Sequence, residues 1–294
     1  MLVRTTPLTA SDIAVIRGWL VPTLTASPGY THIQLVEDFA QRPFGEPILV
    51  RYIEQAHRDS REYFERAFVS TLDPRGIART ALTNYPRKIE EVVRTGLFGE
   101  ILAGLVAEVY GSQNAWFVPA FCFRCHDDPF KALMKSYETG DSLRRSPGRL
   151  GDDCLAFSIE TDGETISQVL ECEAKCTWTH DDRLIAHGHT QLSESSELRL
   201  ELHKVIQVLH DHGSPESISW ELAVMAFRDT RNSLVNRKVD MLVYTHGTKA
   251  RSGTRMNPRS KHANHKAARA LVAVELHVEA LRTKIAELYE AAYP

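Results

Sequence analysis

Alternating polar and hydrophobic positions predict a half-buried strand over residues 169–176. Successive side chains of a strand point to opposite faces. One face of this strand would carry small apolar side chains: Leu170, Cys172, Ala174 and Cys176. The opposite face would carry charged side chains: Glu171, Glu173 and Lys175. Because buried ions need a partner or a metal, this strand is either a functional site or the location of a structural ion pair.

An apolar run over residues 154–157 predicts a second strand, directly after an aspartate pair that ends at Asp153. Between the two runs, residues 161–164 read Thr-Asp-Gly-Glu, which is a hairpin turn signal. We therefore expect the two strands to pair antiparallel. That pairing would bring Asp153 close to Glu173 and Lys175.

Helical periodicity near 3.6 residues predicts helices in most of the remaining chain. The expected helices cover residues 11–21, 46–70, 89–110, 193–212, 218–227 and 263–292, and a further strand is expected over residues 238–245. Residues 1–86 are expected to form an N-terminal helical region. Residues 87–294 are expected to form an α/β domain, in which a mixed β-sheet is flanked by helices and the long C-terminal helix closes the chain.

Composition indicates more about the cellular location of the protein than about its activity. The 294 residues carry a formal net charge of −3, so overall charge does not indicate a nucleic-acid partner. Five cysteines are an odd number, and the first residues do not resemble a signal peptide, which favours a reducing, cytoplasmic location. The chain contains no run of 18 apolar residues, so we expect no membrane span.

The predicted strand pair carries the residue types that phosphodiester hydrolysis requires. Carboxylates are the hard oxygen ligands that Mg²⁺ prefers, and Asp153 and Glu173 would supply two of them. A bound Mg²⁺ would acidify a water and stabilise charge on an attacked phosphorus. Lys175 could orient that water and neutralise developing negative charge.

The order and spacing of these residues resemble a known family. Asp153 followed by Glu173-x-Lys175 resembles the signature of the PD-(D/E)XK nuclease superfamily, the restriction-endonuclease-like fold. Glu100, in a predicted helix upstream, resembles the acidic residue of that superfamily's first helix. More narrowly, the Gly-Glu-Ile-Leu helix, the Gly-x-Asp strand and the Glu-Ala-Lys strand resemble HamA-like nuclease subunits of Hachiman-type anti-phage defence systems. The resemblance covers roughly residues 90–245.

The resemblance implies a restriction-endonuclease-like mixed β-sheet and a metal-dependent DNA endonuclease that works with a superfamily-2 helicase. Asp153 and Glu173 would hold Mg²⁺ or Mn²⁺, Lys175 would position the attacking water, and Glu100 would act through a metal-bound water. The superfamily often has proline before its aspartate, whereas Asp152 stands there in this chain. Either aspartate could therefore be the ligand, and we favour Asp153 because the apolar strand begins directly after it.

Basic residues suggest where DNA would lie. Arg144, Arg145 and Arg149 precede the predicted site and are expected to contact the DNA backbone. Residues 241–274 contain no acidic residue and seven basic ones, so this stretch either contacts phosphates or is a solvated loop. Glu171 is either a further metal ligand or a solvated residue at a strand edge.

Two less specific interpretations remain open. Glu173 and Lys175 could form a structural ion pair, in a non-catalytic nucleic-acid-binding or assembly subunit that keeps the nuclease fold. Four cysteines could bind zinc, although small buried cysteines are also common in cores: Cys122, Cys125, Cys172 and Cys176.

Overall fold

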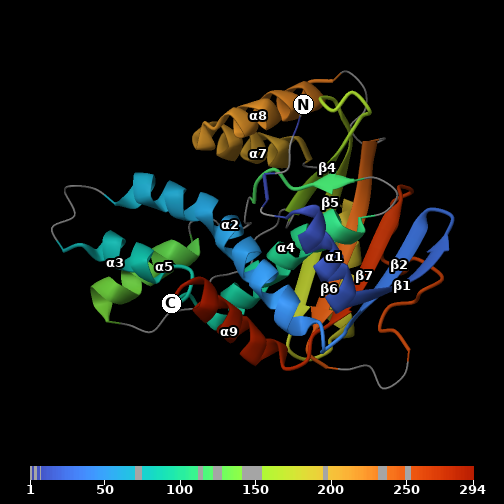
Figure 1. Cartoon of the computed structure of the whole chain (residues 1–294), viewed down its shortest axis with the longest axis horizontal. Helices are drawn as coiled ribbons and strands as arrows, with labels where there is room; N and C mark the ends of the chain where they lie inside the picture. The colour runs from blue at the N-terminus through green and yellow to red at the C-terminus, as the bar shows by residue number, and fades with distance from the viewer. Residues whose placement is uncertain are drawn as a thin grey trace.

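A seven-stranded mixed β-sheet organises the chain (Figure 1). The computed structural model describes residues 2, 5–6, 8–69, 75–111, 115–121, 128–140, 154–194, 198–230, 237–248 and 253–294. The strands are β1 (Leu20–Ser27), β2 (Tyr30–Glu37), β3 (Trp116–Phe117), β4 (Cys154–Ile159), β5 (Ile166–Thr177), β6 (Lys238–His246) and β7 (Leu271–His277). Their order across the sheet is β1-β2-β7-β6-β5-β4-β3.

Helices lie on both faces of this sheet (Figure 1). They are α1 (Ala10–Trp19), α2 (Arg42–Phe68), α3 (Ile77–Asn84), α4 (Glu91–Tyr110), α5 (Asp128–Thr139), α6 (Asp182–Glu194), α7 (Leu198–His212), α8 (Pro215–Arg228) and α9 (Leu281–Ala292). The α/β class expected from the sequence is thus confirmed.

The centre of the sheet is parallel and its margins are antiparallel. Strands β2, β7, β6 and β5 run parallel to one another, whereas β1 pairs antiparallel with β2, and β4 pairs antiparallel with both β5 and β3. Pro22 lies in β1, the edge strand, where a missing N–H does not interrupt a ladder on both sides. Gly29 adopts a left-handed conformation (φ 68°) in the tight turn between β1 and β2.

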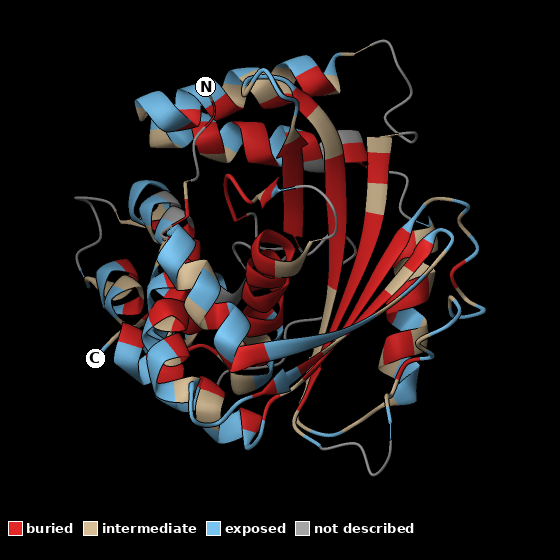
Figure 2. Cartoon of the chain, turned by 45° about the vertical axis from the view of Figure 1, so that its right-hand side comes forward, coloured by how far each residue is buried: buried red, intermediate tan, exposed pale blue. Residues whose placement is uncertain are grey.

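Helix α4 is buried along most of its length and packs on the apolar face of β5. The sheet and this helix are largely red in Figure 2. A Cβ atom added at Gly99 would lie 2.8 Å from Cβ of Cys176, so the glycine allows the close approach of helix and strand. Leu170 and Cys172 contribute to the same core and are fully buried.

The opposite face of the sheet is covered by α6, α7 and α8. Gly188 of α6 lies against Leu242 of β6 and the side chain of Lys175. Beside this helix, Trp220 of α8 packs near Phe157 of β4, with ring centroids 6.2 Å apart. The charged face of β5 is therefore an interior face, not a solvated one.

The expected C-terminal helix over residues 263–292 is wrong in its first half, because β7 and α9 replace it. All but the last residue of β7 are buried, as expected for a central strand that is covered on both faces. Leu271 and Val274 are both buried there, and their spacing happened to match a helical stripe. Strand formation by this β-branched segment satisfies the backbone groups of β2 and β6 on either side.

The prediction of a helical N-terminal region is also wrong in part. Residues 20–37 form β1 and β2, and β2 joins the central sheet beside β7. The helix expected over residues 193–212 is confirmed as α7 over residues 198–212, and α6, which ends at Glu194, was not expected. The long helix expected over residues 46–70 is present as α2.

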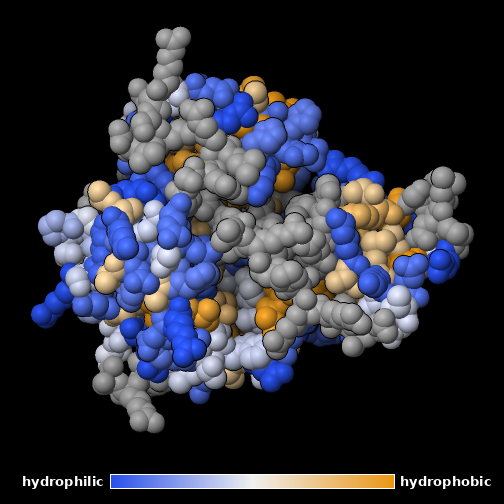
Figure 3. Space-filling view, turned by 180° about the vertical axis from the view of Figure 1, so that it is seen from behind, coloured by the Kyte–Doolittle hydropathy of each residue, from blue (hydrophilic) through white to orange (hydrophobic). Residues whose placement is uncertain are grey.

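Among the described helices, none combines the length and the apolar character needed to cross a lipid bilayer. The described surface seen from behind is largely hydrophilic, and hydrophobic residues form small separate groups on it (Figure 3).

Candidate functional site

Strand register places Glu173 and Lys175 on the sheet face that α6 covers. Glu173 is paired with Leu242 of β6, and Lys175 is paired with Tyr244. Both glutamate and lysine therefore point away from α4, as the alternation of the sequence predicts.

Glu173 and Lys175 contact each other directly through a carboxylate oxygen and the ammonium group. Gln191 of α6 accepts a second hydrogen bond from Lys175 Nζ at 2.7 Å. The side chains of Glu173 and Lys175 are 3% and 11% exposed. The pair is thus enclosed between the sheet and α6, and Gln191 fixes the position of the ammonium group.

The predicted antiparallel pairing of β4 with β5 is confirmed. Cys154, which follows Asp153 in the sequence, is paired with Cys172, the residue before Glu173. The aspartates themselves and the basic turn lie outside the described residues: Arg144, Arg145, Arg149, Asp152 and Asp153. Cys122 and Cys125 also lie outside them.

Glu100 lies on the other side of the sheet. Its helix, α4, packs on the apolar face of β5, opposite to Glu173 and Lys175. Burial raises the pKa values of Tyr85 and Tyr289, and the charge of Glu100 raises them further. The structure therefore brings Glu100 near buried tyrosines and does not bring it next to the Glu173–Lys175 pair.

Glu171 is fully buried and forms an ion pair with Lys238 of β6. The alternative that Glu171 is solvated at a strand edge is therefore wrong. Lys238 Nζ also lies 3.9 Å from Asp240, which is paired with Glu171 in the strand register. Two carboxylates and one ammonium group thus share the interior next to Glu173.

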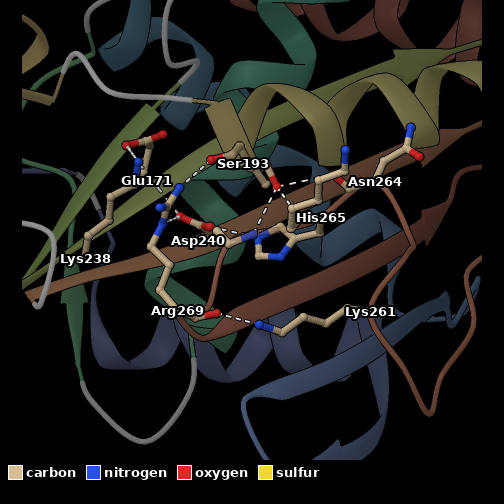
Figure 4. Close-up of polar contacts among 11 residues, drawn as sticks. Glu171, Ser193, Lys238, Asp240, Lys261, Asn264, His265 and Arg269 are labelled. Carbon is tan, nitrogen blue, oxygen red and sulfur yellow. Dashed lines mark hydrogen bonds and ion pairs between the residues drawn. The ribbon is translucent and has the colours of Figure 1, made fainter.

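Asp240 is the centre of this polar network, as Figure 4 shows. Its Oδ2 atom accepts a hydrogen bond from His265 Nε2 at 2.8 Å, and its Oδ1 atom accepts one from Arg269 Nε at 2.7 Å. Ser193 at the end of α6 accepts a hydrogen bond from the backbone N–H of Lys266 at 2.7 Å. These contacts hold residues 265–269 against β6 and α6, whereas many other described residues of the segment between β6 and β7 are exposed.

Another buried acid, Glu275, lies two strands away from Lys175 on the same face. Its carboxylate accepts hydrogen bonds from the N–H groups of Arg255 and Met256 at 2.7 and 3.1 Å. The ring nitrogens of His246 and His32 lie 3.5 and 3.8 Å from it. Burial alone would raise the pKa of Glu275, but these hydrogen bonds lower it to about 2. The carboxylate is therefore charged at neutral pH and fastens the loop to β7.

Carboxylate oxygens match the ligand preference of Mg²⁺, and Glu173 is the described member of the expected ligand pair. In the part of the chain that the structure describes, no group of three or more histidine, cysteine, aspartate or glutamate side chains is placed to hold a metal ion. Cys172 is buried in the core, and Cys176 packs against α4, so these two cysteines behave as small apolar residues.

Sequence reasoning missed several polar residues on the buried face: Gln191, Lys238, Asp240 and His265. It counted Arg269 only among the basic residues of 241–274. A signal was available for Lys238 and Asp240, because they place charges on alternate positions at the start of a predicted strand. Glu171 and Glu173 show the same pattern in β5. No comparable pattern marks Gln191, which is one polar residue of an amphipathic helix. Searches of the chain against protein-family models and against curated proteins found no match.

Proposed function

We propose that this chain is a metal-dependent DNA endonuclease that acts in anti-phage defence. The observation that carries the proposal is the register of β4 on β5, in which Cys154 pairs with Cys172. The strand that follows Asp153 therefore begins beside the strand that carries Glu173 and Lys175. This is the arrangement that the resemblance to the PD-(D/E)XK nucleases calls for, and a restriction-endonuclease-like core is part of the proposal.

In this proposal Asp153 and Glu173 hold Mg²⁺ or Mn²⁺, with Asp152 as the alternative ligand. The bound ion would supply Lewis acidity and an acidified water. Lys175 would orient the attacking water and stabilise negative charge on the phosphate, and the hydrogen bond to Gln191 would hold its ammonium group in place. Glu100 lies in α4, which packs on the opposite face of β5, and is given no role in this proposal.

Because Glu173 and Lys175 are enclosed, this function requires that DNA gains access to them. Glu173 and Lys175 are almost fully covered, so DNA would reach them only after α6 or its surroundings moves away from the sheet. A superfamily-2 helicase partner would provide that opening by presenting DNA to the site. Arg144, Arg145 and Arg149 would contact the DNA backbone in the opened state.

The test is a plasmid-nicking assay with Mg²⁺ or Mn²⁺, with and without EDTA, for the wild type and for Glu173→Gln and Lys175→Met. Both variants should abolish nicking per folded molecule, because each removes a group that the reaction requires. The matched control is Glu275→Gln, which changes the same residue type on the same sheet face, two strands away from Lys175. Since Glu275 holds the N–H groups of Arg255 and Met256, this control should lose stability and keep the nicking activity of its folded fraction.

Burial of the Glu173–Lys175 pair favours one competing function, a non-catalytic nucleic-acid-binding or assembly subunit. In that case the two charges are structural, and removing either leaves a buried ion without its partner. Loss of roughly 3 kcal/mol or more in both variants, with no metal-dependent nicking by the wild type, would show that the pair is structural and would overturn the nuclease proposal.

A further inference from the structure

The segment between β6 and β7 lines a pocket of about 620 Å³ next to the buried polar network. Its walls come from the start of β6, the end of α6, one residue of β5 and the segment itself. The lining residues are Gln168, Ser193, Lys238, Val239, Lys266, Ala267, Ala268, Arg269 and Ala270. Three of these carry positive charge, and none carries a carboxylate.

Buried carboxylates below the pocket hold two of these cations in place. Lys238 contacts Glu171, and Arg269 donates to Asp240 and to the carbonyl of Leu192. The contacts within the described chain use two of the five N–H donors that a guanidinium group has. Arg269 lines the pocket, and these two contacts hold its guanidinium group in a fixed orientation.

Lys266 adds an exposed third cation at the pocket wall. Its backbone N–H is bound by Ser193, which fixes the main chain at this position. The three cations of the pocket exceed the two acids beneath it, Glu171 and Asp240, by one positive charge. The pocket therefore combines room, oriented N–H donors and an excess of positive charge, which are the requirements of a phosphate site.

The position of the pocket relates it to the proposed active site. Lys238 is paired with Val169, four residues before Glu173 on β5, which corresponds to about 13 Å along the strand. Ser193 lies two residues after Gln191 on α6, and Gln191 contacts Lys175. Pocket and proposed site therefore share α6 and the neighbouring strands β5 and β6.

We infer that this pocket binds a backbone phosphate of the nucleic acid, a few nucleotides from the position of cleavage. The inference rests on the proposed function for the identity of the ligand. It gives a role to Lys266 and Arg269, which belong to the acid-free stretch of residues 241–274.

The test measures binding of a fluorescein-labelled single-stranded 30-mer by anisotropy in EDTA, so that cleavage does not contribute. Lys266→Ala should weaken binding roughly five- to ten-fold for every DNA sequence tested. It should also make the dependence of log K on log salt shallower by about 0.7, the value for one single-strand phosphate. Ala268→Glu adds a carboxylate to the exposed pocket wall without removing a contact, and it should weaken binding at least as much.

Two control variants make the same changes of charge at exposed positions away from the pocket. Lys135→Ala on α5 removes an exposed lysine at the far side of the molecule, and Ala286→Glu on α9 adds an exposed carboxylate there (Figure 1). Both should bind like the wild type. The inference is overturned if Lys266→Ala and Ala268→Glu also bind like the wild type with an unchanged salt dependence.

Two further outcomes separate this inference from the proposed function. If binding depends on Lys266 although the wild type never nicks DNA, the pocket assignment stands and the nuclease proposal fails. A last experiment measures whether inorganic phosphate alone raises the melting temperature of the wild type. If Lys266→Ala removes that stabilisation and leaves oligonucleotide binding intact, the pocket takes a small anion, and its assignment to nucleic acid is wrong.

Discussion

Single residues on the interior face of the sheet carry charges whose partners the structure identifies. Lys238 is 4% exposed and contacts Glu171, which is fully buried. Taking such ions out of water is costly, and the pair is tolerated because each charge has a partner. The sequence indicated that Glu171 is unusual, but its partner lies on a strand almost seventy residues away, so no local pattern could reveal it.

Replacing Lys238 with methionine should lower the free energy of unfolding by about 3–5 kcal/mol, because Glu171 would stay buried without its cation. Urea unfolding at pH 7 measures this change. The double variant Lys238→Met/Glu171→Gln should recover part of the loss, since it leaves no uncompensated charge. Lys266→Met, which changes an exposed lysine of the same segment, should alter stability by less than about 0.5 kcal/mol. Equal losses in both lysine variants would contradict the assignment.

A buried histidine, His57, gives a second prediction at the residue scale. Its ring nitrogens lie 3.2 and 3.0 Å from the hydroxyl groups of Tyr85 and Tyr289. Burial, helped by the charge of Arg61, lowers the pKa of His57 to about 3. The unfolded chain protonates this group near its ordinary pKa of 6.5, so the folded state binds fewer protons between these two values.

The contribution of neutral His57 to the free energy of unfolding should therefore be fully present above pH 6.5. It should decrease as the pH falls toward 3. Between pH 6.5 and pH 5 the expected loss is about 1.6 kcal/mol. Urea unfolding at both pH values should show a smaller loss for His57→Gln, whose side chain does not titrate. An equal loss in wild type and variant would show that His57 is not responsible.

At the scale of elements, the packing of α4 on β5 shows what a pattern of residues can and cannot reveal. Gly99 of α4 lies against Cys176 of β5, which lets the helix and the strand approach each other closely. The pattern predicted which face of β5 is apolar. The strand β7 was mistaken for a helix because hydrophobic residues fill nearly every position of a strand buried on both faces, and such a run has no period of its own.

Two glycines of α4 provide a matched test of that packing. A Cβ added at Gly99 would lie 2.8 Å from Cβ of Cys176, whereas one added at Gly96 would meet no atom within 4 Å. Gly99→Ala should therefore destabilise the protein by about 1–3 kcal/mol through overpacking. Gly96→Ala should stabilise it by about 0.5–1 kcal/mol, because alanine favours the helix. Thermal unfolding compares the two, and a stabilising Gly99→Ala would contradict the tight contact.

At the scale of the whole molecule, features that depend on residues close in the sequence could be predicted, and features that depend on the packing of distant segments could not. The β4–β5 pair with its charged face could be predicted, since a short turn joins the two strands and alternation fixes their faces. The enclosure of Glu173 and Lys175 by α6 could not, because it depends on how a helix packs after the strands have formed. The position of Glu100 on the other face of the sheet was beyond reach for the same reason.

The sheet also joins segments that the sequence separated at residue 86. Strand β2 pairs with β7, and Glu46 of α2 forms an ion pair with Lys284 of α9 at 2.7 Å. The largest hydrophobic core includes side chains from both parts, among them Trp19 and Tyr52 from the first and Leu288 from the second. Both parts therefore contribute to a common core, and each would expose apolar surface without the other.

A fragment of residues 87–294 should consequently fail to fold alone, although it contains every residue of the proposed active site. Its circular dichroism should show no cooperative thermal transition, because β7 loses a neighbouring strand and α9 loses α2. Co-expression with a fragment of residues 1–86 should restore a stable complex that purifies as one species, since the two pieces share the core. A fragment that unfolds cooperatively near the melting temperature of the full chain would instead establish two independent domains, and the division at residue 86 would then be correct.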